Sequence, residues 1–379
     1  MHITQELWIP NQSPKTTAKR GNCVAPQLVL IFAAPEQLRD PTTWAHLRER
    51  WPQATLVGGS TAGEICKTRV LDDSVVATAL EFERSSLRFA QVALADTTSS
   101  VEVGQRLGEQ LLAPELVHVF VLSDGLKVNG SELVSGLTER LPPEVAVTGG
   151  LCGDGARFKQ TYVCLNEFSA AENVIAIGLY GRSLRVGFGS LGGWDPFGPE
   201  RRVTRSDGNI LYELDGSPAL DLYEQYLGEH AAGLPASGLL FPLTVRQLRE
   251  EPGVVRTILA VNHETRSLTF AGDVPNGYYA RLMRANFDRL LDGAAGAAQT
   301  CFEAIGSRTP DVAILISCVG RKLVLKQRIE EEVESVQRVL GSEAVLTGFY
   351  SYGEISPFAP SARCELHNQT MTITTLSEV

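Results

Sequence analysis

The sequence predicts an α/β fold of mixed α+β character, built from repeated modules and divided into two domains. In each of three copies an apolar strand runs into an amphipathic helix, and a second short strand follows the helix. Each second strand ends in a glycine-framed turn that carries an acidic residue. Recurrence on this scale indicates duplicated units. We therefore expect β-α-β-β-β modules whose mixed sheets are covered by helices.

The three copies share one order of elements. Their first strands lie at residues 28–32, 117–122 and 311–316. Their helices lie at residues 35–51, after Gly130, and at residues 326–340. Their glycine turns lie at residues 58–65, 149–155 and 348–355. Because the turns occupy the same place in each copy, we expect them to gather around shared clefts.

Alternating apolar residues predict further strands that pair as hairpins. The predicted hairpins join residues 75–82 to 87–94, residues 173–180 to 184–188, and residues 257–261 to 267–271. A helix at residues 101–112 is expected between the first two copies, and residues 280–306 also have a helical pattern.

The strongest break in the chain is the glycine- and proline-rich run at residues 192–199. A helix at residues 217–227 follows it, with Ser217 as the expected N-cap. We place the domain boundary near residues 200–220. The expected division is a flexible lead-in at residues 1–26, a first domain at 27–215 with two modules, and a second domain at 216–379 with the third.

The predicted helix of the third copy has one apolar face. Ile329, Val333, Val336 and Leu340 share one face, and Gly341 follows as the expected C-terminal cap. The acidic run at residues 330–332 is expected to lie on the solvated face.

Composition narrows the class of protein. The 379 residues are 44% hydrophobic and 21% charged, typical of a globular protein with a large core. A net charge of −10 disfavours nucleic-acid binding. Seven scattered cysteines favour a reducing cytoplasm. Because no apolar run is long enough to cross a bilayer and no signal peptide is visible, we expect a cytoplasmic protein without membrane insertion.

Catalytic motifs are weak in this sequence. Ser60 lies between glycines, but the second glycine comes one residue too late for a nucleophile elbow. The glycine pattern at residues 187–192 does not open a helix, which excludes a dinucleotide-binding turn. Neither a Walker loop nor zinc-ligand spacing is present, so we expect no metal site. An enzyme that uses Ser60, Cys152 or Cys318 as nucleophile stays open as one hypothesis.

Histidine and arginine supply the other candidates for binding. His118 alternates with apolar residues in a strand and is interpreted as a core residue. His263 lies in a turn, and His367 lies in a polar run that enters the last strand. Arg321 follows the first strand of the third copy, where open α/β sheets place ligand-binding groups. Its guanidinium group would clamp a carboxylate or be paired with an acid.

Four segments together resemble the FIST family of bacterial signal-transduction proteins. They are residues 58–65, residues 149–155 with Phe158, residues 317–321, and residues 348–355; residues 366–370 fit as well. The resemblance implies a FIST N-terminal and a FIST C-terminal domain that form a sensory module without catalysis. It also implies a small ligand and a partner that is a histidine kinase or a cyclic-di-GMP enzyme. The length and layout resemble the NosP-type members, which bind haem and sense nitric oxide.

These observations define the expected site. The residues expected to bind the ligand are Ser60, Thr61, Gly63, Glu64, Gly150, Asp154, Arg321, Tyr350, Tyr352 and Glu354. Haem with nitric oxide is the leading ligand pair, with His367 or His263 as the axial ligand of the iron. The alternative ligand is a small carboxylate such as an amino acid, held by turn amides and Arg321. A homo-oligomer is also considered.

Overall fold

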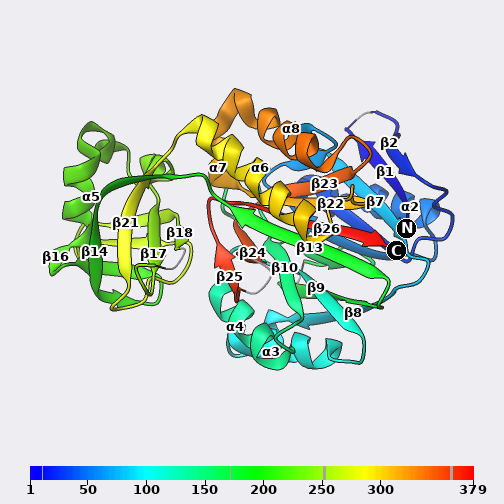
Figure 1. Ribbon diagram of the computed structural model, residues 1–379, viewed down its shortest axis with the longest axis horizontal. Coiled ribbons are helices and arrows are strands. Elements are labelled where there is room, and N and C mark those ends of the chain that lie inside the picture. Colours follow the sequence, from blue (N-terminus) through cyan, green and yellow to red (C-terminus); the bar gives the residue numbers. More distant parts are fainter. Residues whose placement is uncertain (11, 171, 251–252, 359–361) are drawn as a thin grey trace.

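Four β-sheets organise the residues that the structure describes. The computed structural model describes residues 1–10, 12–170, 172–250, 253–358 and 362–379. Three sheets have six strands each and lie together, while an eight-stranded sheet forms a separate, smaller body (Figure 1). A mixed α/β fold is therefore confirmed.

The six-stranded sheets are named here in chain order. The first sheet has the spatial order β11 (Val163–Leu165), β4 (Thr55–Ser60), β3 (Leu28–Ala33), β7 (Val75–Glu81), β1 (His2–Trp8) and β2 (Lys15–Arg20). The second sheet has the order β25 (Cys364–His367), β24 (Gly353–Pro357), β10 (Ala146–Leu151), β9 (Leu116–Ser123), β12 (Asn173–Tyr180) and β8 (Ser86–Ala93). The third sheet has the order β13 (Leu184–Leu191), β26 (Met371–Glu378), β22 (Val312–Cys318), β23 (Val345–Ser351), β5 (Glu64–Cys66) and β6 (Arg69–Leu71).

The smaller body is built from residues between β13 and helix α6 (Phe287–Ala304). Its strands have the order β18 (Val254–Arg256), β17 (Leu243–Arg246), β21 (Tyr279–Arg284), β14 (Asp195–Asp207), β15 (Ile210–Leu214), β20 (Ser267–Phe270) and β19 (Ile258–Asn262), with β16 (Ser217–Pro218) beside β15. It also contains α5 (Ala219–Leu227), η2 (Gly228–Gly233) and η3 (Ala236–Leu240). The predicted pairing of β19 with β20 is confirmed.

Each module lends a short strand to the sheet of another module. The parallel pairs β3–β4, β9–β10 and β22–β23 form the centres of the three sheets. After its glycine turn, the first module sends β5 to pair with β23 of the third sheet. The second module sends β11 to β4 of the first sheet, and the third module sends β24 to β10 of the second sheet. The modules are thus interlocked in a closed cycle.

The long strands that follow also cross between sheets, so two predicted hairpins are wrong. β7 lies in the first sheet, but β8 pairs with β12 in the second sheet. β12 lies in the second sheet, but β13 pairs with β26 in the third sheet. Alternation of apolar residues identified these strands correctly, but it carries no information about which neighbour each strand pairs with.

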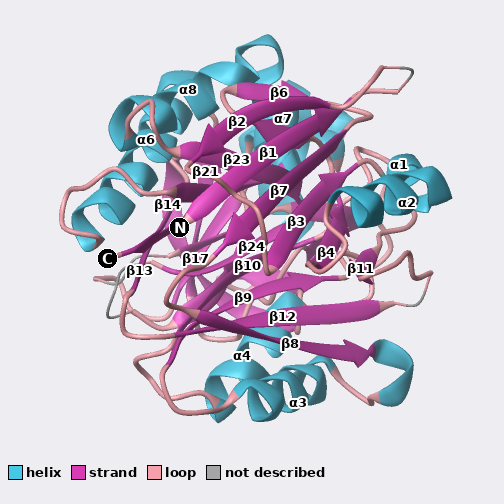
Figure 2. Cartoon of the chain, turned by 90° about the vertical axis from the view of Figure 1, so that its right-hand side faces the viewer, coloured by secondary structure: helices cyan, strands magenta, loops and turns pink. Residues whose placement is uncertain are grey.

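Helices cover the outer face of each six-stranded sheet (Figure 2). α1 (Pro35–Arg39) and α2 (Pro41–Arg50) pack on the first sheet, and α3 (Ser100–Leu111) and α4 (Gly130–Arg140) on the second. α6 and α8 (Ile329–Leu340) pack on the third. The remaining helices are α7 (Val319–Leu325), η1 (Leu94–Asp96) and η4 (Lys326–Arg328).

The inner faces of the three sheets meet in a central core. The strand registers place equivalent residues of the three first strands in layers. These layers consist of Phe32, Leu122 and Ile316, then Leu30, Phe120 and Ile314, and finally Leu28, His118 and Val312. All nine side chains are buried. His118 is the one polar residue among them.

At two of the three seams of the central core, where the inner faces of two sheets meet, a pair of threonines lies at equivalent positions. Thr78 Oγ1 donates to Thr347 Oγ1 over 2.9 Å between the first and third sheets. Thr374 Oγ1 donates to Thr148 Oγ1 over 2.7 Å between the third and second sheets. Val57 and Ile177 hold the corresponding positions at the third seam and lie in the apolar core. The polar pairs satisfy each other, as buried hydroxyl groups must.

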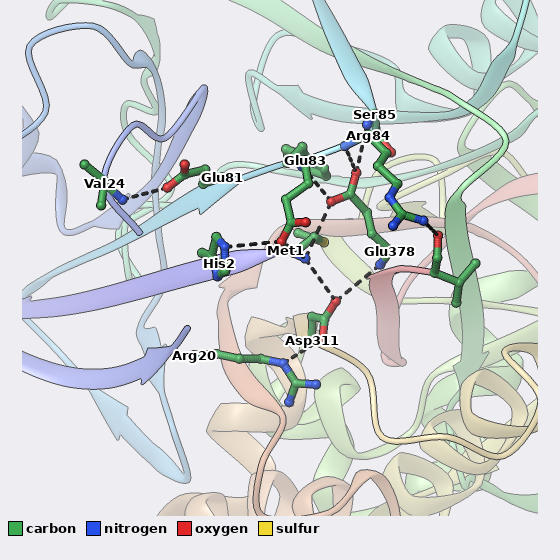
Figure 3. Close-up of polar contacts among 12 residues, drawn as sticks. Met1, His2, Arg20, Val24, Glu81, Glu83, Arg84, Ser85, Asp311 and Glu378 are labelled. Carbon is green, nitrogen blue, oxygen red and sulfur yellow. Dashed lines mark hydrogen bonds and ion pairs between the residues drawn. The ribbon is translucent and has the colours of Figure 1, made fainter. Parts of the chain in front are cut away.

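The N-terminal residues belong to the fold, which corrects the expected flexible lead-in at residues 1–26. β1 pairs with β7, and β2 pairs with β1. Figure 3 shows Arg20 of β2 beside Asp311 at the start of the third module, with Nε and Oδ1 2.6 Å apart. In the same view Glu378 accepts hydrogen bonds from the amides of residues 83–85. These contacts join strand ends of different sheets.

The spatial bodies also differ from the expected domains at residues 27–215 and 216–379. The third module does not lie in the separate body, because its sheet packs against the first two.

Within α8, Val333, Val336 and Leu340 are buried as predicted, and Gly341 follows with φ +93°. Glu332 is also fully buried, which corrects its predicted solvent-exposed position. Ser217 is not the N-cap of α5, since Pro218 holds that place without a side-chain hydrogen bond.

Close approach between neighbouring strands requires glycine at position 348. Gly348 has φ +153°, and a Cβ atom there would lie 1.8 Å from the Leu315 carbonyl oxygen. Gly348→Ala is therefore expected to lower the free energy of unfolding by about 3 kcal/mol or more, because both strands must move. Gly306, also at positive φ but with open space around it, provides the control: Gly306→Asn should cost less than about 1 kcal/mol. Chemical denaturation measures both, and equal losses would contradict this account.

Candidate functional site

The three glycine turns meet at one end of the central core, as the repeated pattern predicted. Three equivalent backbone hydrogen bonds close a ring there. The amide of Gly153 donates to Ser60 O over 2.9 Å, Tyr352 N to Leu151 O over 3.0 Å, and Ala62 N to Tyr350 O over 2.8 Å. Each turn is thereby tied to the end of a second strand from another module. This ring completes the cycle that the exchanged strands begin.

Two turn acids have the same structural role in different modules. Glu64 accepts hydrogen bonds from Thr61 Oγ1 and from the amide and hydroxyl of Ser74. Glu354 accepts the equivalent bonds from Ser351 Oγ and from the amide and hydroxyl of Thr370. Each carboxyl group thus anchors the start of a third strand. Burial raises the pKa of Glu64 to about 7 and that of Glu354 to about 8.

The turn of the second module is different, because its acid organises a loop. Asp154 accepts hydrogen bonds from the amides of Phe158, Lys159 and Gln160 at 2.8–2.9 Å. The Tyr352 hydroxyl also donates to Asp154. The rings of Phe158 and Tyr352 stack with centroids 4.4 Å apart. The predicted residues Asp154 and Tyr352, from two modules, therefore meet in one cluster.

The other predicted turn residues serve packing and internal hydrogen bonds. Ser60 Oγ accepts from the amide of Tyr162 over 2.9 Å. The amide of Gly63 donates to Thr61 Oγ1, and Gly150 packs against Ile316 on the central axis. The turn amides at residues 62, 63, 153, 154, 155 and 352 all have partners within the protein. To hold a carboxylate, they would have to exchange these partners.

Arg321 is fully buried and its donors are occupied. Nε donates to Glu332 Oε1 over 2.6 Å, and Nη2 lies 2.5 Å from the same oxygen. The remaining donors reach the backbone carbonyls of residues 192, 290 and 369. Tyr350 Oη and Ser317 Oγ donate to the other Glu332 oxygen over 2.8 and 3.1 Å. Arg321 is therefore placed in an ion pair with a neighbouring acid, and a clamp on a ligand would require this pair to open.

The three candidate nucleophiles are poorly placed for covalent chemistry. Burial raises the pKa of both Cys152 and Cys318, which disfavours the reactive thiolate. Ser60 is completely buried, and its hydroxyl oxygen is held by a backbone amide. Among the described residues, no His, Cys, Asp or Glu side chains gather into a group of three that could hold a metal ion.

The histidines predicted to bind haem differ in environment. His263 is exposed in the turn between β19 and β20. His367 is buried, its Nε2 lies 2.8 Å from Ser356 O, and Phe358 packs edge-on against its ring. Burial lowers the pKa of His367 to about 4, so its imidazole is neutral at pH 7. Neither side chain lines the cavity of about 820 Å³ described next.

The histidine that lines this large cavity is His118. The cavity, called here the His118 cavity, lies beside the starts of β9 and β10, the end of α4, and β13. His118 is 1% exposed, and its Nε2 lies 2.7 Å from Thr148 Oγ1. Its Nδ1 has no partner among the described residues. Burial lowers the pKa of His118 to about 3, which keeps the ring neutral.

The sequence predicted that His118 is a core residue, and its burial confirms this. When the three modules are aligned, the second is the only one with a polar residue at this position. Leu28 and Val312 occupy the equivalent positions in the first and third modules. A histidine at this position is therefore not required by the packing of the repeated core.

The raised pKa of Glu354 has a measurable consequence. Between its ordinary pKa and about 8, the folded state holds a proton that the unfolded state has lost, so stability falls as pH rises. From pH 7 to 8, above most of the range in which the buried histidines matter, Glu354 should contribute a loss of about 1 kcal/mol. Glu354→Gln should remove this contribution in denaturant titrations, whereas Glu331→Gln at the surface should not. An unchanged slope in Glu354→Gln would refute the assignment.

The Arg321–Glu332 pair is expected to support the fold. Arg321→Met leaves a carboxylate buried without its partner and should cost about 3–5 kcal/mol. Adding Glu332→Gln should recover part of this loss. Arg338→Met, at an exposed position of α8, should cost less than about 1 kcal/mol. A small effect of Arg321→Met on the unfolding midpoint would instead favour a role confined to ligand binding.

The chain matches two known protein domains over most of its length. A FIST N domain matches residues 27–217, and a FIST C domain matches residues 219–357. An uncharacterized protein of Methanocaldococcus jannaschii is 22% identical over 342 residues, 83% of this chain; the chain spans 64% of that relative's length. A crystal structure of a cyanuric acid hydrolase from A. caulinodans aligns with 78% of this chain and 99% of its own, at 9% identity and a TM-score of 0.18, too low to carry an argument.

No helix among the described residues is long and apolar enough to span a membrane. The two domain matches together cover more than half of the sequence, and the chain belongs to the FIST family, whose domains act in sensing and signal transduction.

Proposed function

We propose that this sensory protein binds haem in the His118 cavity, responds to nitric oxide, and modulates a partner histidine kinase or cyclic-di-GMP enzyme. One observation carries the choice of cavity: a buried imidazole with an unpartnered nitrogen lines it, where the sister modules have aliphatic side chains. The resemblance to NosP-type members supports the choice of haem and nitric oxide.

The histidine at position 118 lowers the stability of the fold. A buried nitrogen without a hydrogen-bond partner costs about 1–3 kcal/mol of stability. Leu28 shows that a leucine fits the equivalent place in another module. Residues that break a repeated structural pattern at a cost to stability mark functional positions. His118 is such a residue.

The protonation state of His118 suits a metal ligand. Haem iron takes a neutral imidazole, and the depressed pKa of His118 keeps it neutral throughout the physiological range. Cys364 lines the same cavity, but burial raises the pKa of its thiol and disfavours the thiolate. His118 is therefore the better candidate in this cavity.

Other residues that line the cavity suit the porphyrin ring and the propionates of haem. Leu184, Val186 and Phe188 of β13 supply apolar surface for a porphyrin. Arg185 and Arg363 also line the cavity and would pair with the propionates, although Glu139 and Glu144 lie on the same lining. Bound there, haem would supply the iron that binds nitric oxide. The residues present thus fit the group that the resemblance implies.

The proposal includes the cytoplasm as the place of action. All seven cysteines lie among the described residues, and each is a free thiol. That state is typical of a reducing compartment. The alternative ligand, a small carboxylate, is less well supported, because the turn amides and Arg321 that were expected to hold it are engaged within the protein.

His118→Leu tests the effect of the histidine on stability separately from its role in haem binding. We expect this variant to unfold at higher denaturant, with a gain of about 1–2 kcal/mol, because it removes the unpartnered nitrogen. We also expect it to lose the stoichiometric Soret band that haemin gives with the unaltered chain, and the shift of that band on adding nitric oxide. His118→Gly with added imidazole should recover the band.

His263→Ala and His367→Ala serve as matched histidine controls. Both should keep the Soret band if His118 is the axial ligand. A band that survives in His118→Leu and disappears in His367→Ala would transfer the role to His367. Absence of stoichiometric haem binding by the unaltered chain would refute the haem proposal as a whole.

A further inference from the structure

A second cavity, of about 520 Å³, lies between the smaller body and the ends of the central strands. It is called here the interbody cavity. Phe158 and Tyr352 form one wall, and Cys318, Val319 and Leu323 at the start of α7 form another. Leu126, Ala156 and Gly320 complete the lining on this side of the cavity. The smaller body contributes Pro235, residues of η3, Thr257 with the start of β19, and Ala271. Strand ends of this kind are a common place for ligands in α/β proteins.

The lining of the interbody cavity is apolar and uncharged. None of the described residues that line it carries a formal charge. Three large apolar side chains in this lining are exposed: Phe158 at 45%, Leu259 at 47% and Leu323 at 38%. Contiguous exposed apolar surface in a hollow indicates a binding site. A charged ligand would lose its hydration there without gaining a counter-ion, so the occupant is neutral.

One polar group in the lining needs a partner. The Thr257 side chain is 6% exposed, and its Oγ1 has no hydrogen-bond partner among the described residues. The backbone of Thr257 is held by the amide of Ala271 over 2.9 Å, which fixes the position of the residue. A buried hydroxyl group in a fixed position is suited to a ligand with a single donor or acceptor.

The aromatic pair indicates the shape of the ligand. The rings of Phe158 and Tyr352 are nearly parallel, with an angle of 14°, and Asp154 holds the Tyr352 hydroxyl and the Phe158 amide. This arrangement offers a fixed aromatic wall against which a flat ring packs well. We propose that the interbody cavity binds a small neutral aromatic molecule with one hydrogen-bonding group, of the size and polarity of indole.

Such a ligand would link the two bodies of the protein. The described polar contacts between them include the bonds from Arg256 Nη1 to Leu366 O over 2.8 Å and from Asn129 Nδ2 to Asp273 Oδ1 over 3.3 Å. A molecule that touches both walls favours the arrangement in which the cavity is closed. This site is separate from the His118 cavity, and the inference does not depend on haem.

The test uses the full chain with N-phenyl-1-naphthylamine as the fluorescent probe and indole as the competitor. We expect saturable displacement by indole at one site per chain, and none by indole-3-carboxylate at the same concentrations. Leu323→Glu should abolish binding of the probe. Leu191→Glu, at a similarly exposed leucine outside the cavity, should leave binding unchanged.

Thr257→Val tests the single polar contact. Indole should bind about five- to tenfold more weakly to this variant, whereas naphthalene, which has no hydrogen-bonding group, should bind equally well. Circular dichroism confirms that each variant is folded. Equal probe binding in Leu323→Glu and the unaltered chain, or competition by indole-3-carboxylate as strong as that by indole, would overturn the proposal.

Discussion

The exchange of short strands between modules is the constraint on which the rest of the structure depends. β5, β11 and β24 each complete a sheet that belongs to another module. The edge of each strand that faces the foreign sheet is paired only in this arrangement, and buried peptide groups without partners are costly. The ring of hydrogen bonds at residues 62, 153 and 352 fixes where the exchanged strands leave their own modules. Close strand packing, buried acids and the central layers all follow from this crossing.

Both proposed binding sites lie where the three modules cease to be equivalent. Two turns carry a glutamate that anchors a strand, but the turn of the second module carries Asp154, which organises a loop and an aromatic wall. Two modules have an aliphatic residue in the last layer of the central core, but the second has His118. His118 lines one cavity, and Phe158 and Tyr352, which Asp154 holds, line the other. In these proposals a repeated scaffold provides the stability, and single departures from the repeat provide the binding chemistry.

Much of the architecture was predictable because it depends on periodicity. The parallel strand pairs, the gathered turns and the buried face of α8 follow from the spacing of apolar residues and glycines. The partners of the long strands were not predictable, since β7 and β8 have the pattern of a hairpin but lie in different sheets. Glu332 was expected at the surface because it belongs to an acidic run, and spacing within α8 does not show that Arg321 of α7 pairs with it in the interior. The proposed site at His118 follows from the alignment of the modules that the strand registers establish.

The interlocked modules also constrain how the chain is made. The first sheet needs β11 from the second module, and the second sheet needs β24 from the third. A nascent chain that has emerged only through β12 therefore holds central strands with unpaired edges, which are prone to associate with other chains. The three sheets close only after β26 has left the ribosome, because β26 lies between β13 and β22. Folding of the three sheets thus cannot be completed before β26 has been made, and the division into two sequence domains does not give two units that mature in turn.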